Sequence, residues 1–182
     1  MNPSDSWIEP ILHFWFEELQ PQAWFTADAK LDEVIRAKFY EVHEQLRQGV
    51  PKTVTATARG CLAAVIVLDQ FPRNMFRGSA VAFATDALAL SISEQAIVAG
   101  LDQGLSVQQR TFLYMPFQHS EDPAVQARSI ELFASLNDEL LGYAQQHKAI
   151  IDRFGRFPHR NAMLGRISNA EELEFLETHP GF

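Results

Sequence analysis

Cysteine is almost absent from this 182-residue sequence, which has only Cys61. A disulfide needs two cysteines, so these residues cannot form a disulfide framework. Cys61 lies inside an apolar run, and free cysteine is among the residue types most often buried. We therefore predict a buried, unreactive thiol rather than a catalytic nucleophile.

Positive charge is also scarce. Lys and Arg number 15 against 23 Asp and Glu, which gives a formal net charge of -8 at pH 7. A general nucleic-acid binder needs a basic face that contacts phosphates. The composition therefore argues against this class, and we predict no nucleic-acid partner.

Targeting and membrane signals are missing as well. Residues 1–6 (MNPSDS) lack the positive and apolar regions of a secretory signal. The longest uninterrupted apolar run, 61–68, is far shorter than the roughly 20 residues that cross a bilayer. We therefore expect a cytoplasmic protein with no membrane span and no membrane partner.

Familiar cofactor and metal motifs do not occur. The sequence has no glycine-rich nucleotide loop, no HExxH string, no EF-hand loop and no paired cysteines. We predict no cofactor and no metal. A metal site could otherwise draw only on His119, Glu121, His147 and His159.

Hydrophobic residues are abundant, at 47% of the chain with 14 Phe and 3 Trp, which is ample material for one core. They recur at helical spacing, as in Ile8, Ile11, Leu12, Trp15 and Leu19. Further stripes lie in residues 31–46, 56–68, 80–99, 106–115 and 122–154. With a short last helix after residue 168, this pattern predicts about seven helices.

The run 61–68 (CLAAVIVL) is apolar at every position and is open to two interpretations. It could be a buried helix, or a parallel strand that ends at Asp69. A parallel sheet needs several such runs, and the sequence has no second one. Helix is the better interpretation.

Glycine, proline and capping residues mark the predicted helix ends. Gly100 and Gly155 stand where helix C-termini favour glycine. Pro116 is expected to kink or end its helix near Met115, and Ser106 is a plausible N-cap for that helix.

The last two predicted helices have their own boundary signals. Asp122 and Pro123 begin the stripe 122–154, which we expect to bend at Gly142, and 168–171 (SNAE) reads as a capping box. Short connections between such stripes favour antiparallel neighbours. The sequence therefore predicts an all-α fold of stacked antiparallel αα-hairpins, in a single helical domain over residues 1–182.

Three polar stretches follow predicted helix ends: 69–74 (DQFPRN), 115–122 (MPFQHSED) and 154–161 (FGRFPHRN). Loops on a rigid scaffold are common positions for functional sites. If the hairpins stack, the three stretches should converge on one rim. The first and third also echo each other, as FPRN and FPHRN.

A local basic island favours an anion site at the third stretch. Between residues 147 and 166 there are five Lys or Arg residues and a single acid, Asp152. Four of the five are Arg, whose planar fork binds carboxylate or phosphate. The alternative is that these arginines pair with internal acids such as Asp69, Glu121 or Asp122.

The leading functional hypothesis is a pocket that binds a small anionic molecule or a peptide carboxylate. The predicted ligand-binding residues are Asp69, Arg73, Asn74, His119, Glu121, Arg156, His159, Arg160 and Asn161. The arginines would hold the anion, the asparagines would orient it, and the phenylalanines of the two echoing stretches would form apolar walls.

Two further hypotheses stay open. One is a hydrolase or transferase that uses His159 or His119 for acid–base catalysis, with Asp69 or Glu121 as its orienting partner. Ser120 is a poor candidate nucleophile, because adjacent side chains in a loop rarely reach one another. The other is a helical scaffold that binds partner proteins. The aromatic side chains of residues 24–25 (WF) are open to two interpretations, as part of a homodimer contact or as part of the core.

The same stretches carry a resemblance. The matching strings are 14–16 (FWF), 68–74 (LDQFPRN), 116–121 (PFQHSE), 154–161 (FGRFPHRN) and 164–166 (LGR). They resemble the signature of the bacterial family catalogued as domain of unknown function 924. The resemblance implies an all-α, tetratricopeptide-like α-α superhelix, and it implies no activity or ligand.

Overall fold

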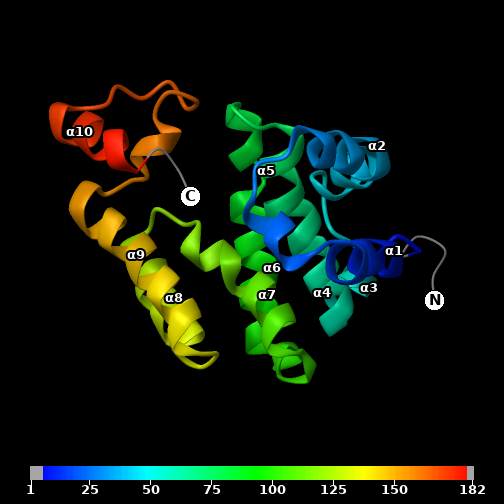
Figure 1. Ribbon diagram of the computed structural model, residues 1–182. Coiled ribbons are helices and arrows are strands. Elements are labelled where there is room, and N and C mark those ends of the chain that lie inside the picture. Colours follow the sequence, from blue (N-terminus) through cyan, green and yellow to red (C-terminus); the bar gives the residue numbers. More distant parts are fainter. Residues whose placement is uncertain (1–5, 180–182) are drawn as a thin grey trace. The chain divides into compact units, whose positions relative to one another are not determined.

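The structure, a computed structural model, describes residues 6–179 (Figure 1). Within these residues it contains helices, turns and bends but no strand, which confirms the all-α prediction. The chain divides into two compact units. Unit 1 takes in the chain up to Arg77 and then Val81–Pro116, and unit 2 takes in Gly78–Ala80 and the chain from Phe117 onward. The single domain over residues 1–182 and the tetratricopeptide-like superhelix stay predictions.

Most of the helical segments belong to unit 1. They are α1 (Ile8–His13), π-helix η2 (Phe14–Glu18), 3-10 helix η3 (Pro21–Phe25), α2 (Ala29–Leu46), α3 (Lys52–Thr55), α4 (Ala58–Val65), π-helix η4 (Ile66–Gln70), α5 (Phe71–Met75), α6 (Asp86–Val98) and 3-10 helix η6 (Leu101–Gly104). Two segments cross the boundaries between units, 3-10 helix η5 (Ala80–Phe83) and α7 (Val107–Gln118). The helices outnumber the roughly seven that the sequence predicts, because several stripes break into shorter pieces.

Unit 2 holds the remaining helices. They are α8 (Pro123–Ala134), α9 (Asp138–Phe154), 3-10 helix η7 (Pro158–Arg160) and α10 (Ala170–Thr178). Consecutive helices α8 and α9 pack along each other, and a three-residue connection joins them (Figure 1). This pair is the clearest example of the predicted αα-hairpins.

The core of unit 1 is built around the apolar run 61–68. Every side chain from Cys61 to Leu68 has an exposed fraction of 0%, in continuous helix that runs from α4 into η4. The helix interpretation of this run is therefore correct. Helix α4 packs against α1 and α6, so that its apolar side chains are covered.

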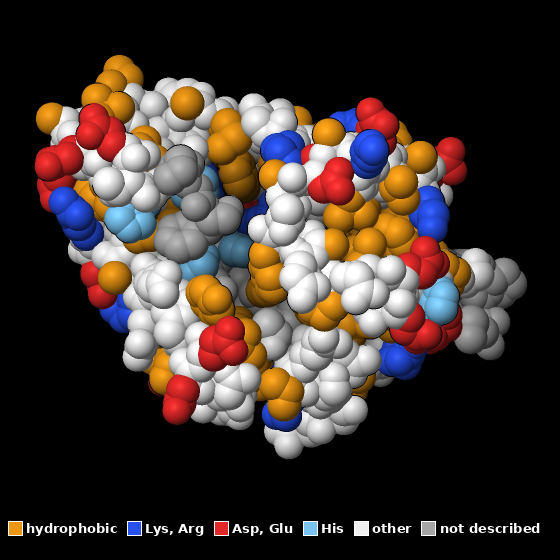
Figure 2. Space-filling view, viewed as in Figure 1, with side chains coloured by type: hydrophobic (Ala, Val, Ile, Leu, Met, Phe, Trp, Pro, Cys, Tyr) orange, Lys and Arg blue, Asp and Glu red, His pale blue; other side chains and the backbone are white. Residues whose placement is uncertain are grey.

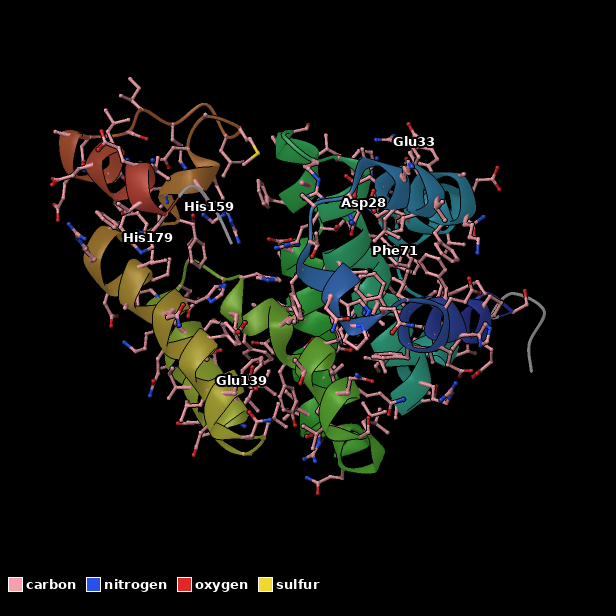
Figure 3. All side chains as sticks on the ribbon, in the orientation of Figure 1. Asp28, Glu33, Phe71, Glu139, His159 and His179 are labelled. Carbon is pink, nitrogen blue, oxygen red and sulfur yellow. The ribbon has the colours of Figure 1, made fainter. Side chains whose placement is uncertain are left out.

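Aromatic rings fill the space beside this helix. Phe71 is buried, and its ring lies 4.8 Å from the ring of Phe39 on α2 and 5.6 Å from that of Trp15 (Figure 3). Trp15 in turn meets Phe112 of α7 edge-on at 5.5 Å. The aromatic stripe of the first helix is thus core, as its spacing predicts.

Cys61 is buried, as predicted. Its thiol donates to the carbonyl of Thr55 at 3.3 Å, and burial raises the pKa of the thiol to about 11. The thiolate is the reactive form of cysteine, so this residue is a core side chain rather than a nucleophile.

Several predicted helix ends are confirmed. Gly100 and Gly155 take left-handed backbone conformations, with φ of 69° and 68°. The Asp122 carboxylate accepts from the N–H of Ala124 at the start of α8. Ser106 accepts from the N–H of Gln109, as an N-cap does.

The predicted helix 80–99 is wrong at its beginning. The α-helix starts at Asp86, after a 3-10 turn at Ala80–Phe83. Thr85 stands at the N-cap position of α6, and its hydroxyl donates to the carbonyl of Leu68 at 2.5 Å instead of capping the helix. This tertiary hydrogen bond holds the residue that precedes α6 in place.

The predicted helix 122–154 is two helices, and its break is at residues 135–137 rather than at Gly142. The side chain of Asn137 accepts from the N–H of Leu140 and begins α9 as its N-cap. The last capping box is also shifted by one residue. It joins Asn169 with Glu172.

Pro116 does not end α7, which continues to Gln118. The connection that follows α7 is held by a buried amide on α8. The Gln126 side chain donates to the carbonyls of Gln118 and Ser120, both at 2.7 Å, and so satisfies backbone acceptors that the end of a helix leaves unpaired.

One stretch of the described chain, 80–98, is long and apolar enough to cross a membrane by length and composition alone. A third of it is buried inside the protein. The 3-10 turn at its beginning leaves only Asp86–Val98 as α-helix.

Candidate functional site

The first polar stretch forms a junction inside unit 1. Pro72 has no N–H, so the carbonyl of Leu68 four residues earlier loses its helical donor. Thr85 supplies the missing donor at 2.5 Å. Pro72 therefore leaves the Leu68 carbonyl available to accept from Thr85. This hydrogen bond connects the junction of η4 and α5 to the start of α6.

Arg73 completes this junction. Its guanidinium binds the Asp86 carboxylate through two hydrogen bonds of 2.9 and 3.0 Å, and it donates to the carbonyl of Asp69 at 2.5 Å. The Asp69 carboxylate, with no exposed surface, lies 3.3 Å from the same guanidinium. These two carboxylates raise the pKa of Arg73 despite the opposing effect of burial. The charges at the junction are thus paired within the protein.

Asn74 connects α5 to α2. Its amide donates to Asp32 of α2 at 2.8 Å, and Arg77 binds the same carboxylate through two hydrogen bonds of 2.8 and 2.9 Å. The hydrogen bonds from Arg77 and Asn74 outweigh burial and lower the pKa of Asp32. These contacts fasten α5 to α2. In unit 1 the predicted site residues therefore have protein partners that connect helices.

The second and third stretches meet in unit 2 through Glu121. Its carboxylate accepts from the backbone N–H of Phe157 at 2.8 Å and is bound by Arg166 through hydrogen bonds of 2.7 and 2.9 Å. The hydrogen bonds from Arg166 and Phe157 lower the pKa of Glu121 against the effect of burial. Two of the three predicted stretches are thus brought together.

Arg156 makes a second ion pair in the same region. It binds the buried Glu172 through hydrogen bonds of 2.6 and 2.8 Å and donates to the carbonyl of Ile167 at 3.0 Å. Glu172 also accepts from the N–H of Asn169 at 2.8 Å. Arg156, above all, lowers the pKa of Glu172 to about 2. Arg156 therefore closes the loop 155–169 onto the first turn of α10.

Asn161 lies inside this loop. It is buried, and its amide donates to the Ser168 hydroxyl at 3.0 Å. Its backbone carbonyl accepts from the N–H of Arg166 at 2.8 Å. Asn161 thus joins the middle of the loop to its C-terminal part.

Two of the remaining predicted residues of unit 2, His159 and Arg160, lie against the ring of Phe157. The His159 ring centre lies 5.7 Å from that of Phe157, and the guanidinium carbon of Arg160 lies 4.5 Å from it (Figure 3). His147 of α9 approaches the same ring at 5.8 Å, and His119 lies 6.3 Å from His147. We call these five side chains the Phe157 cluster. Histidines gather on this part of unit 2 in Figure 2.

The Phe157 cluster is rich in groups that carry or can carry positive charge. Arg160 is only 7% exposed and His147 only 8%. His147 Nδ1 lies 2.9 Å from the carbonyl oxygen of Tyr143, which can only accept, so this nitrogen carries a proton. The acids of the surrounding loops, Glu121 and Glu172, are bound by Arg166 and Arg156. An anion is the ligand that such a group of side chains would attract.

The structure distributes the predicted ligand-binding residues over both units. Asp69, Arg73 and Asn74 belong to unit 1, and His119, Glu121, Arg156, His159, Arg160 and Asn161 belong to unit 2. Convergence of all three stretches on one rim stays a prediction.

Sequence reasoning left His147 and Glu172 out of the predicted ligand-binding set. His147 falls between Ala144 and Ile151 on the buried stripe of α9, and this position was a usable signal. The only sequence signal at Glu172 was its position three residues after Asn169. That spacing predicts a capping box, but it does not predict an ion pair with Arg156.

Among residues 6–179, no group of three or more His, Cys, Asp or Glu side chains could hold a metal ion.

Over residues 11–180 the chain matches the family described as "Bacterial protein of unknown function (DUF924)". The chain belongs to this family. The resemblance carried by the three polar stretches is thereby confirmed. The chain is also similar to a solved structure, "Protein of Unknown Function ATU0120 from Agrobacterium tumefaciens", with 38% identity and a TM-score of 0.89. The alignment covers 96% of this chain and 98% of that one. Comparison with curated proteins finds no match.

Proposed function

We propose that this DUF924 protein binds a small anionic molecule or a peptide carboxylate at the Phe157 cluster. The observation that carries the proposal is the gathering of Arg160, His147 and His159 around one buried aromatic ring, with His119 beside His147. A guanidinium offers paired donors to a carboxylate or phosphate, and the flanking imidazoles add further donors.

The electrostatics of unit 2 support this choice of ligand. Glu121 and Glu172 already have arginine partners, Arg166 and Arg156. Arg160 is close enough to Glu121 to contribute to the lowering of its pKa. The ionisable side chains of the cluster itself are one arginine and three histidines, and each histidine that binds a proton adds positive charge.

Arg156 and Glu121, by contrast, are assigned a supporting role. They fix the loop 155–169 and the start of α8, which present Arg160 and His119. The hydrolase or transferase hypothesis and the protein-scaffold hypothesis stay predictions, because both depend on partners beyond the contacts described.

Thermal melts followed by circular dichroism test the proposal. Wild type, Arg160→Gln and His159→Gln would each be melted with phosphate, citrate, and a short peptide with either a free or an amidated C-terminus. Ligands that bind the folded state raise the melting temperature. We expect wild type to be stabilised by at least one of the anions and both variants to lose that shift.

Arg128→Gln is the matched control, because Arg128 is an exposed arginine of the same unit on α8. It should keep the anion-induced shift. His159→Gln covers the case in which Arg160→Gln does not fold. A shift that survives in His159→Gln and in folded Arg160→Gln, or that is lost equally in Arg128→Gln, contradicts the proposed site. A shift with the free-acid peptide but not with the amide identifies a peptide carboxylate as the ligand.

A further inference from the structure

Unit 1 has an open groove that the Phe157 cluster does not involve. It lies between the α1–η2 segment and α2 and has a volume of about 720 Å³. Phe14 and Phe39 line its apolar part, and their rings pack 5.1 Å apart. In Figure 2, hydrophobic side chains are visible between these helices, with acidic side chains and a histidine beside them.

The charges along this groove are mainly negative. Three glutamates and a single lysine, Lys38, line it. Glu9 is bound by Arg59 through a bidentate contact, which lowers the pKa of Glu9. Glu17 and Glu18 are contacted by His13 and Lys38, and their side chains are 69% and 43% exposed.

The contacts of Lys38 show that a cationic group can be bound within the groove. Its ammonium nitrogen lies 4.7 Å from the centre of the Phe14 ring and 3.2 Å from a carboxylate oxygen of Glu18. An aromatic face and a carboxylate together favour an organic cation. His13, which lies 2.9 Å from Glu17 and 3.7 Å from Glu18, links the two acids.

The length of the groove favours a chain segment over a single small amine. Glu9 and Glu18 lie nine residues apart on continuous helix, which corresponds to at most about 14 Å at the 1.5 Å rise per residue of an α-helix, since Phe14–Glu18 is π-helix. This length fits roughly two turns of a bound helix. The net charge of -8 also favours approach of a basic partner.

We propose that this groove binds a basic amphipathic segment of a partner protein. Lys or Arg side chains of the segment pair with Glu17 and Glu18, and its apolar side chains cover Phe14 and Phe39. The bound segment competes with Lys38 for Glu18 and for the Phe14 ring.

Fluorescence anisotropy with a labelled amphipathic peptide tests this inference. The probe carries Leu on one helical face and Arg on the other. We expect it to bind wild type and to bind the Glu17→Gln/Glu18→Gln double variant about tenfold more weakly, which corresponds to the loss of two exposed ion pairs. Lys38→Met should bind the probe more tightly, because the substitution removes the competing cation.

Glu94→Gln is the matched control, because Glu94 is an exposed acid on α6. It should leave the affinity unchanged. Absence of binding to wild type, or equal affinity in the double variant, overturns the proposal. So does equal binding of a probe with Glu in place of Arg. Spermidine that displaces the probe at or below the probe's own dissociation constant would instead identify a small polyamine as the occupant. Arg160→Gln should leave peptide binding intact, so this test is separate from that of the anion site.

Discussion

At the scale of single residues, the polar signature of this family separates into side chains that join helices and side chains that gather around one ring. Arg73, Asn74 and Arg156 each bind a carboxylate of another element. Arg160 and His159 pack on Phe157. A motif of one-letter codes does not reveal this division, because it depends on partners that are distant in the sequence.

His43 is a buried histidine whose behaviour can be predicted at the same scale. It is 1% exposed, and neither ring nitrogen makes a hydrogen bond, although Nδ1 lies 3.3 Å from a Glu44 oxygen without the alignment of one. Burial lowers the pKa of His43 from its usual 6.5. The unfolded chain therefore binds a proton at a higher pH than the folded chain does. Stability contributed by neutral His43 is complete above about pH 6.5 and is lost as the pH falls through the folded pKa.

We expect His43→Phe to weaken this pH dependence. Urea unfolding at pH values from about 7.5 down to 5 would measure it by tryptophan fluorescence, since all three tryptophans, Trp7, Trp15 and Trp24, lie in unit 1. His179→Gln, at an exposed histidine, is the control and should retain the wild-type dependence. A His43→Phe protein that lost as much stability on acidification as wild type would show that other groups are responsible.

At the scale of elements, helix interiors follow local rules and helix junctions do not. Gly60 stands at the third position of α4, where an added Cβ would lie 2.0 Å from the backbone carbonyl oxygen of Val54. Glycine is thus needed for the close approach of α3 and α4. Gly142, inside α9, has no atom within 4 Å of the same added carbon.

This contrast gives a paired prediction. Gly60→Ala should destabilise unit 1 by roughly 2 kcal/mol, because the backbone must shift to accept the methyl group. Gly142→Ala should stabilise α9 by about 0.5–1 kcal/mol, because alanine loses less backbone entropy in a helix. Urea unfolding would measure both, by tryptophan fluorescence for Gly60→Ala and by circular dichroism for Gly142→Ala. Equal effects at the two positions would contradict the close approach at Gly60.

At the scale of the whole molecule, net charge is the property that most limits the choice of partners. The chain carries a formal net charge of -8 at pH 7. Nucleic-acid affinity arises mainly from cations that neutralise phosphates.

We therefore expect no measurable binding of a labelled DNA duplex or single-stranded RNA at about 150 mM salt, with any weak association lost as salt rises. Fluorescence anisotropy checks this, and the Arg160→Gln protein is a useful comparison. Binding to wild type that disappeared in Arg160→Gln would identify the anion of the Phe157 cluster as a nucleic-acid phosphate and would contradict the prediction drawn from net charge.

The sequence by itself determined the helical class, the burial of residues 61–68, and the ends at Gly100, Gly155 and Asp122. Each of these depends on periodicity or on the conformation of a few neighbouring residues, which a linear pattern records. Membership of the family was likewise predicted from the short sequence strings that match its signature.

Only the tertiary structure decided where α6 begins, where α8 gives way to α9, and which acid binds which arginine. The Arg166 partner, Glu121, lies 45 residues earlier in the chain, and the Leu68 carbonyl that holds Thr85 lies 17 residues earlier. Such pairs form because packing brings distant elements within hydrogen-bonding distance and because a buried charge or carbonyl without a partner is costly. Neither condition can be read along the chain.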